Sequence, residues 1–204
     1  MPTYLEKQLL EADKNWRINF INSLFGYKNL NILITRSSDG IYNAAIFNSG
    51  LHIGSSPPYI GFLLRPTKVP RHTYENLLSY PYATMNVISE TTYRQAHLTH
   101  HHIPREKSEL DYAGLKVEWV KDIPIPFLQD SPIRAYLRFS EEHFLRVNQT
   151  RLLIFAILWV DVRGEVAPDG FIALDSLGVV AGSGCDAYYR SALLGREAIR
   201  RERD

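Results

Sequence analysis

The sequence has a single cysteine, Cys185, and lacks any hydrophobic run long enough to cross a membrane. One cysteine cannot form an intramolecular disulfide, so the fold does not depend on an oxidising compartment. The longest apolar run, Leu152–Val160, has about half the length that a membrane-spanning helix requires. Residues 1–15 mix acids, bases and leucines without the apolar core of a secretion signal. We therefore expect a soluble, cytoplasmic protein.

An excess of charge of either sign is also missing. The 23 lysines and arginines nearly balance the 22 aspartates and glutamates, which gives a formal net charge of +1. Phosphate-backbone binding needs a concentrated basic surface, so neither nucleic acid nor a membrane is expected as a partner. One basic cluster lies at the C-terminus and is interpreted as a solvated helix end. It consists of Arg196, Arg200, Arg201 and Arg203.

The 204 residues, 45% of them hydrophobic, are enough for one sizeable core, so a single domain over residues 1–204 is expected. Runs rich in β-branched and aromatic residues, separated by turn signals, predict several strands. These runs are Leu30–Arg36, Ile41–Asn48, Tyr59–Arg65, Tyr82–Ile88, Ile133–Phe139, Phe144–Val147 and Leu152–Val162. Asp39-Gly40 is a typical hairpin turn, and Ala167–Gly170 predicts a turn within a last short pair of strands.

Helical patterns are few. They predict helices near Arg71–Ser79, Thr91–His101 and Ser108–Ala113, with a helix-like tail at the C-terminus. Many antiparallel strands joined by hairpins indicate a closed barrel rather than a parallel sheet of βαβ units. The predicted fold class is therefore mainly β with flanking helices.

Gly182-Ser183-Gly184 resembles the start of a dinucleotide-binding loop, but the rest of that motif is missing. The motif needs a helix, a second strand and an acidic residue about twenty positions further on, and only that many residues follow Gly184. We interpret the glycines as a turn that caps a helix. Cys185 has no nucleophile-elbow context, since the chain contains no GxSxG, and is interpreted as a packed cysteine.

Histidines concentrate at His97 and His100–His102. His97 and His101 could share a helix face and bind zinc. Adjacent histidines on a helix diverge by about 100°, however, and no HExxH pattern accompanies them. We interpret the cluster as a polar loop or pocket edge and predict no metal site.

The predicted strand over Tyr42–Ser49 contains small and polar residues. Such residues weaken a strand unless something must approach its backbone closely. A flat heteroaromatic ring is one candidate and a tightly packed barrel corner is the other, and composition leaves both open.

A phosphate site is predicted where Pro70–Asn76 opens a helix. Thr73 suits the N-cap position, and free N–H groups at a helix start attract anions. Helix capping explains Thr73 but not the two arginines beside it, Arg65 and Arg71, whose charges would strengthen the binding of a phosphate.

These segments occur in an order that resembles the flavin-reductase-like proteins with an FMN-binding split barrel. The likeness covers roughly residues 17–194, and its specificity comes from the shared order and spacing rather than from one motif. The segments that carry it are Asn19–Gly26, Asn43–Ser49, Ser56–Phe62, Arg65-Pro66, His72–Asn76, Tyr82–Val87, Asp169–Ile172 and Gly184–Tyr189.

The resemblance implies a six-stranded antiparallel split barrel that forms a homodimer and binds FMN without a covalent bond near each subunit boundary. In this family the strand matching Asn43–Ser49 lines the isoalloxazine ring, and the helix start binds the phosphate. The FMN-binding residues implied here are Asn43, Ala45, Phe47, Asn48, Ser49, Arg65, Arg71, His72, Thr73 and Asn76. Asn48 departs from the pattern, since many relatives have Ser there, and its larger amide can donate as well as accept.

The implied activity is that of an NAD(P)H:FMN oxidoreductase, in which the nicotinamide passes hydride to the flavin N5. The cofactor does this chemistry, so no catalytic residue is assigned, although His97 and Thr99 are placed near the nicotinamide side. A flavin-dependent monooxygenase is a candidate electron acceptor. Two alternatives stay open. One is an FMN carrier or electron-transfer protein that shares the fold but oxidises little NAD(P)H. The other is a binding module without a pocket, or a protein for a different ligand such as haem or pyridoxal phosphate.

Overall fold

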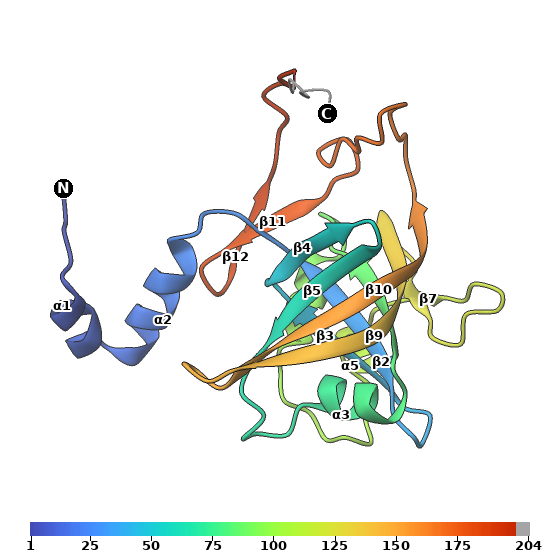
Figure 1. Cartoon of the computed structure of the whole chain (residues 1–204), viewed down its shortest axis with the longest axis horizontal. Coiled ribbons are helices and arrows are strands. Elements are labelled where there is room, and N and C mark those ends of the chain that lie inside the picture. Colours follow the sequence, from blue (N-terminus) through green and yellow to red (C-terminus); the bar gives the residue numbers. More distant parts are fainter. Residues whose placement is uncertain (199–204) are drawn as a thin grey trace.

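The computed structural model describes residues 1–198, and strands account for most of its regular structure (Figure 1). The helices are α1 (Glu6–Glu11), α2 (Lys14–Ser23), α3 (His72–Ser79), α4 (Tyr93–Leu98) and α5 (Glu109–Ala113). The strands are β1 (Lys28–Asn29), β2 (Asn31–Arg36), β3 (Tyr42–Phe47), β4 (Gly50–Ser55), β5 (Pro58–Leu64), β6 (Tyr82–Val87), β7 (Val117–Glu118), β8 (Phe127–Leu128), β9 (Ile133–Leu145), β10 (Thr150–Val162), β11 (Val180–Ser183) and β12 (Ala187–Arg190). The predicted mainly β class is confirmed.

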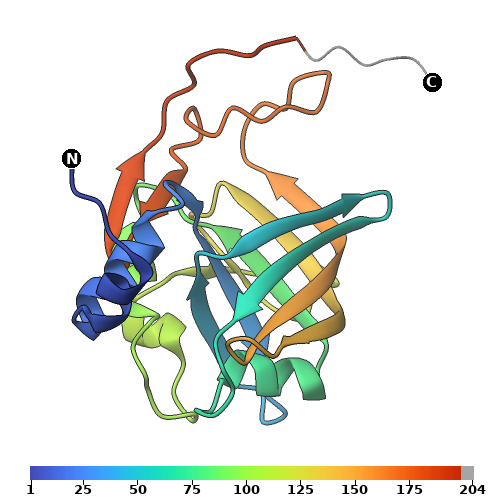
Figure 2. The same cartoon turned by 60° about the vertical axis from the view of Figure 1, so that its left-hand side comes forward.

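Seven strands form one antiparallel sheet in the order β3-β2-β6-β9-β10-β5-β4, which curls into a barrel (Figures 1 and 2). The two edge strands, β3 and β4, follow each other in the chain and are joined only through Asn48-Ser49. Asn29 lies beside this junction and donates from Nδ2 to the Gly50 carbonyl at 2.8 Å. The barrel is therefore split between β3 and β4.

The sheet has seven strands where the resemblance implies six, and one of the seven, β4, was not predicted from the sequence. Its sequence contains Gly50 and Gly54, and its side chains are mostly exposed, so it lacks the alternating apolar pattern of a half-buried strand. Pairing with β5 holds it in the sheet. By contrast, β2, β3, β5, β6 and β10 follow the predicted runs to within two residues.

One further strand boundary was wrong. Phe144–Val147 was predicted as a separate strand, whereas β9 continues through Leu145. Opposite β10, Phe139 pairs with Phe155 and Glu141 pairs with Ile154, so Ser140 is an extra residue that forms a bulge. A bulge inserts one extra residue while the pairing of the two strands continues. The alternation of side chains in the sequence is thereby interrupted, which is why the single strand was predicted as two.

Two apolar clusters pack on the two faces of the sheet. β2 is buried on both, since Leu33 belongs to one cluster while Ile32 and Ile34 belong to the other. The cluster of Leu33 also contains Phe62, Leu137 and Phe155, whereas the cluster of Ile32 includes residues of α4 and α5. The short helices therefore cover the β2 face that lies away from Phe155.

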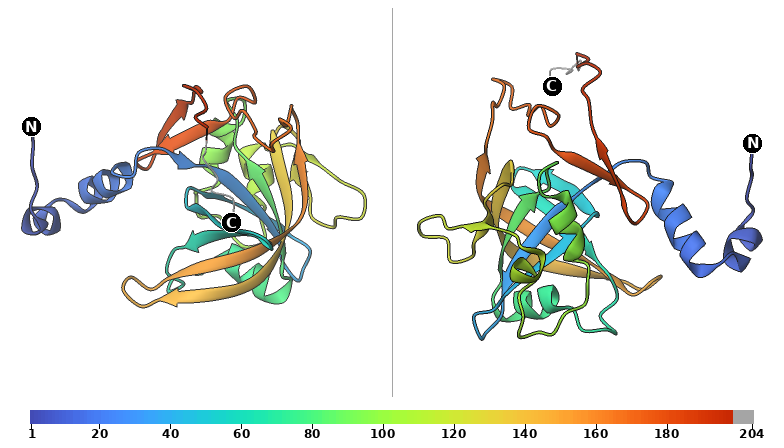
Figure 3. Two further views of the ribbon diagram at one scale, coloured as in Figure 1. Left: turned by 45° about the horizontal axis from the view of Figure 1, so that its top comes forward. Right: turned by 180° about the vertical axis from the view of Figure 1, so that it is seen from behind.

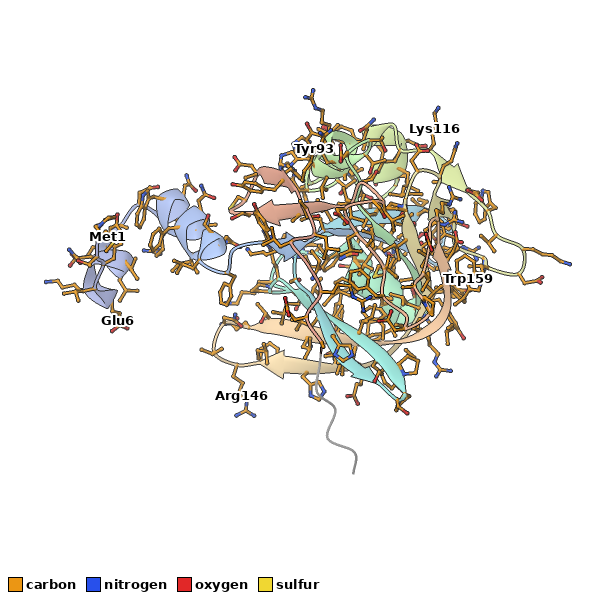
Figure 4. All side chains as sticks on the ribbon, turned by 90° about the horizontal axis from the view of Figure 1, so that it is seen from above. Met1, Glu6, Tyr93, Lys116, Arg146 and Trp159 are labelled. Atoms are coloured by element: carbon orange, nitrogen blue, oxygen red, sulfur yellow. The ribbon has the colours of Figure 1, made fainter. Side chains whose placement is uncertain are left out.

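The chain outside the sheet contributes a second small sheet and an arm. β1 pairs with β11, and β11 pairs with β12. Helices α1 and α2 project away from the barrel, and Figure 4 shows Met1 and Glu6 at the far end of this arm, remote from Tyr93 and Trp159 (Figures 3 and 4). Asp13 begins α2 by accepting from Asn15 N at 2.9 Å and Trp16 N at 3.0 Å.

The helix predicted after Gly182–Gly184 is wrong. Gly182 lies in β11, Gly184 turns the chain with a φ of +60°, and β12 follows, so this segment is a β-hairpin. Residues 191–198 contain no helix, and Arg196 pairs with Asp169 instead of ending one. The other members of the basic cluster, Arg200, Arg201 and Arg203, lie outside the described residues.

The remaining predictions of local structure agree with the structure or are shortened by it. The turn at Ala167–Gly170 is present and is closed by one bridge between Val166 and Ile172. Helices α4 and α5 occupy the predicted segments but are shorter. Within residues 1–198, no helix combines the length and apolar character that crossing a membrane would take.

Candidate functional site

A cavity of about 630 Å³ lies between β3, the start of α3, the segment after α4 and the β11–β12 turn. Most of the residues that the resemblance implies for FMN binding line it. They are Asn43, Ala45, Phe47, Asn48, Ser49, Arg65, Arg71, His72 and Thr73. Asn76 is outside this lining and is almost fully buried, where its Nδ2 donates to Thr35 Oγ1 at 3.1 Å. The structure thus brings together side chains up to 30 positions apart, and their binding roles stay predictions.

The ring-facing candidate strand, β3, is an edge strand whose outer backbone groups are only partly used. Glu109 Oε2 accepts from Ala44 N at 3.0 Å, and Ser108 Oγ donates to the Tyr42 carbonyl at 2.6 Å. Because successive residues of a strand direct their backbone groups to opposite edges, Ile46 presents its N–H and C=O to the same outer edge. Ile46 lines the cavity, so this part of the edge can hydrogen-bond to a bound ligand.

Glu109 is a buried carboxyl that sequence reasoning missed. Its side chain lines the cavity, and burial raises its pKa, although the hydrogen bond from the Ala44 N–H works in the opposite direction. No local pattern identifies it, because Ala44 is 65 positions away in the chain. Its carboxylate accepts the hydrogen bond of an outward-facing N–H of the edge strand β3, next to the cavity.

The predicted N-cap role of Thr73 is wrong. Arg71 occupies the N-cap position of α3 with an extended backbone, φ −126° and ψ 94°, and Thr73 is the second residue of the helix. The Thr73 hydroxyl instead accepts from Asn43 Nδ2 at 2.9 Å. Since a hydroxyl that accepts this bond keeps its own proton free to donate, Thr73 links β3 to the helix start and still offers a donor to the cavity.

The start of α3 places free backbone N–H groups and two arginines at one corner of the cavity. The Arg71 carbonyl accepts from the N–H groups of Tyr74 and Glu75, whereas the hydrogen bonds of the described residues include none from the N–H groups of His72 and Thr73. Burial and the charge of Arg65 lower the pKa of Arg71. Neither arginine forms an ion pair with an acid among residues 1–198. Free N–H groups and two unneutralised cations suit a phosphate.

Histidines form another part of the cavity wall. His97 and His100–His102 line the cavity together with Tyr188, and the imidazole of His101 bonds Tyr112 Oη through Nδ1 at 2.8 Å. The rings of His72 and His102 stack with centroids 6.0 Å apart. In the part of the chain that the structure describes, no three His, Cys, Asp or Glu side chains are arranged to hold a metal ion.

The β11–β12 turn is the main part of the site that sequence reasoning left without a role. Residues 182–188 line the cavity. Asn19 Oδ1 accepts from Cys185 N at 3.1 Å, and a Cβ at Gly184 would lie 2.5 Å from the same oxygen. Cys185 is exposed, so its interpretation as a packed cysteine is wrong. Its contact with Asn19, 166 positions away, explains why local sequence did not show this arrangement.

An antiparallel barrel that is open between its first and last strands, with a cavity beside one of these edges, is a split barrel. A model of the family described as "Flavin reductase like domain" matches residues 27–176. The chain therefore belongs to the flavin reductase like family, which confirms the resemblance read from the sequence.

Solved structures agree with this assignment. A Shewanella frigidimarina protein with a split barrel domain, assigned as a flavin reductase, is 33% identical, with a TM-score of 0.93 over 98% of this chain and 100% of that one. Nitrilotriacetate monooxygenase component B from Bacillus cereus is 15% identical, with a TM-score of 0.82 over 97% and 98%. An FMN-binding protein from Thermus thermophilus is 16% identical, with a TM-score of 0.74 over 97% and 100%. The last two share the fold.

Proposed function

We propose that this chain binds FMN without a covalent bond and reduces it with NAD(P)H. The observation that carries the proposal is one cavity with an anion-binding corner at the start of α3 and free backbone groups on the β3 edge. A phosphorylated cofactor with a flat ring needs both features in one place. Family membership supports a flavin-binding oxidoreductase, and FMN as the cofactor is part of the proposal.

The residues present fit FMN by their chemistry. Arg65, Arg71 and the free N–H groups of His72 and Thr73 would hold the phosphate. The side chain of Ala45 is small, so a flat ring can come close to the backbone of β3. The backbone N–H and C=O groups of Ile46 can form hydrogen bonds with the edge of that ring. Asn48 adds an amide that can donate or accept. Bound FMN supplies the hydride-accepting chemistry, and the chain supplies binding, orientation and partial shielding from water.

A class of electron acceptor is proposed from a solved structure with the same fold. Nitrilotriacetate monooxygenase component B shares the fold, so a flavin-dependent monooxygenase that receives reduced flavin is a suitable partner class. A cytoplasmic location belongs to the same proposal, since NAD(P)H is available there and the fold contains one cysteine and no disulfide requirement.

An anaerobic bleaching experiment tests the proposal. We expect protein loaded with FMN to lose its yellow colour when NADH or NADPH is added, much faster than free FMN at the same concentration. An FMN carrier would bind the flavin but bleach at the rate of the free cofactor. Protein that takes up no FMN in equilibrium dialysis, or that purifies with the spectrum of haem or pyridoxal phosphate, would contradict the proposal.

We also propose a homodimer, because the N-terminal arm exposes apolar side chains that its own chain does not cover. Leu24 is 61% exposed and Phe25 82%, and Leu10 is exposed further along the arm. Large apolar side chains that stay exposed in one chain are often covered in protein interfaces. The arm is also connected to the cavity, since Ile18 of α2 lies in its lining.

Light scattering after size-exclusion chromatography measures this state. Wild-type protein is expected at about twice the chain mass of 23.4 kDa. The double variant Leu24→Ser/Phe25→Ser should shift toward the monomer, whereas Leu78→Ser, which changes a similarly exposed leucine on α3, should not. A wild-type monomer at micromolar concentration would contradict the homodimer.

A further inference from the structure

His97 and Tyr188 form a hydrogen-bonded pair in the cavity wall, on the side built by α4 and β12. His97 Nδ1 lies 2.8 Å from Tyr188 Oη, although the two residues are 91 positions apart. Their rings meet edge to face, with centroids 5.8 Å apart and planes at 78°. Both residues line the cavity, whereas the proposed flavin contacts come from β3 and the junction after it, from Arg65 and from the start of α3. The pair is therefore outside the set of residues proposed to hold FMN.

The phenol of Tyr188 is able to act as the donor in this hydrogen bond. Burial and the nearby Asp186 raise the pKa of Tyr188 to about 12, so its hydroxyl keeps its proton at neutral pH. Among the described residues, His97 Nδ1 is the one hydrogen-bond partner of that hydroxyl. With Nδ1 as its partner, the Tyr188 hydroxyl can donate and Nδ1 can accept, and we take this direction as part of the inference.

The tautomer of His97 follows in turn. Burial and the neighbouring His100 lower the pKa of His97, which keeps its imidazole neutral at pH 7. A neutral imidazole carries one proton, and when Nδ1 accepts, that proton is on Nε2. The hydrogen bonds of residues 1–198 include none from His97 Nε2, so this N–H is available to whatever enters the cavity.

We propose that His97, oriented by Tyr188, donates its Nε2–H to a carbonyl oxygen of a planar compound that shares the cavity with the flavin. The inference rests on the proposed function, because a flavin on β3 leaves the wall of His97 and Tyr188 for the second reactant. The ligand class is a conjugated carbonyl compound. Its oxygen can belong to the carboxamide of the reduced nicotinamide or to the carbonyl of an organic electron acceptor such as a quinone.

The first test reads the tautomer without any turnover. In ¹⁵N spectra of protein labelled at histidine, His97 of the wild type should show the Nε2–H form. Tyr188→Phe, which removes only the hydroxyl, should produce a mixture of tautomers. Tyr189→Phe is the matched control, since Tyr189 packs on Tyr27 and is outside the cavity lining. A wild-type His97 in the Nδ1–H form overturns the proposal.

The second test measures binding to oxidised, FMN-loaded protein by perturbation of the flavin spectrum. Nicotinamide should bind roughly 3–10-fold more weakly to His97→Leu than to wild type, the fold-change of one lost hydrogen bond. His97→Gln, whose amide keeps a donor, should restore part of the affinity. 3-Methylpyridine, which has no carbonyl, should bind all these proteins equally. The same titration is made with 1,4-naphthoquinone, and equal affinity of wild type and His97→Leu for both compounds overturns the proposal.

Kinetics then distinguish the two sources of the oxygen. A rise in KM for NADH in His97→Leu, with kcat less affected, identifies the nicotinamide carboxamide. A rise in KM for 1,4-naphthoquinone during reoxidation identifies the acceptor. Unchanged KM values in both half-reactions overturn the proposal. FMN affinity of the wild type and of each variant is measured first. Absence of FMN binding by the wild type would refute the proposed function. Normal FMN binding with unchanged ligand affinities refutes the role of His97 alone.

Discussion

Replacing Arg71 and Thr73 together with alanine is expected to weaken FMN binding by about 2–4 kcal/mol, or roughly 30–1000-fold in Kd. The arginine contributes a charge beside two free N–H groups, and the threonine contributes a hydroxyl whose proton is not used by its bond to Asn43. Each bond lost to the phosphate is worth about 1–2 kcal/mol. Fluorescence titration of FMN with the purified variant measures the change.

Riboflavin provides the internal comparison for this variant. Because it has the ring and ribityl chain of FMN but no phosphate, its affinity should fall little in Arg71→Ala/Thr73→Ala. Lys68→Ala is the matched control, since it removes the same charge from an exposed residue of the same segment that is outside the cavity lining. An unchanged FMN Kd in the double variant would place the phosphate elsewhere in the cavity.

The backbone N–H groups set a limit on this effect. The free N–H groups of His72 and Thr73 remain in the double variant, because α3 begins without a side-chain cap from the described residues. The helix start therefore keeps part of its attraction for an anion. We expect residual FMN binding that weakens as ionic strength rises, since the remaining contact is electrostatic and partly exposed.

Much of the barrel could be predicted from sequence because its strands carry local signals. Leu30–Arg36 and Tyr82–Ile88 are rich in β-branched, aromatic and other apolar residues, and Asp39-Gly40 marks a hairpin. β4 was not predicted, because its glycines and exposed side chains carry no such signal. It is ordered by pairing with β5. The bulge at Ser140 was not predicted for a similar reason, since only the pairing with β10 shows that β9 continues past it.

The cavity could be predicted in part. The segments that include Asn43, Arg65 and Arg71 were found because small residues and unpaired charges are visible in sequence, and the family resemblance placed them together. The roles of Glu109 and Tyr188 in the cavity wall were not predicted, because each acquires its position through a partner far away in the chain. Thr73 shows the difference clearly: its type predicted a helix cap, whereas its contact with Asn43 makes it a link between strand and helix.

Phe155→Ala is expected to destabilise the folded protein by about 3–5 kcal/mol, because it removes a ring from the centre of the barrel. Phe155 on β10 is fully buried, and its ring contacts Phe62 on β5 at 6.0 Å and Phe139 on β9 at 5.7 Å between centroids. These three strands are neighbours in the sheet, so the ring fills the space that they enclose. The surrounding backbone is held by ladder hydrogen bonds and can close only part of the resulting void.

Phe144→Ala is the matched control, since it makes the same change on β9 where the ring is half exposed. Its expected cost is below about 1 kcal/mol, mainly the loss of its contact with the Arg151 guanidinium, which lies 5.2 Å from the ring centroid. Thermal unfolding without flavin should show Phe155→Ala lower by on the order of 10 °C and Phe144→Ala close to wild type. Flavin is left out because a ligand that binds only the folded state would raise both midpoints. Equal midpoints for the two variants would mean that the Phe62–Phe155–Phe139 cluster does not stabilise the barrel.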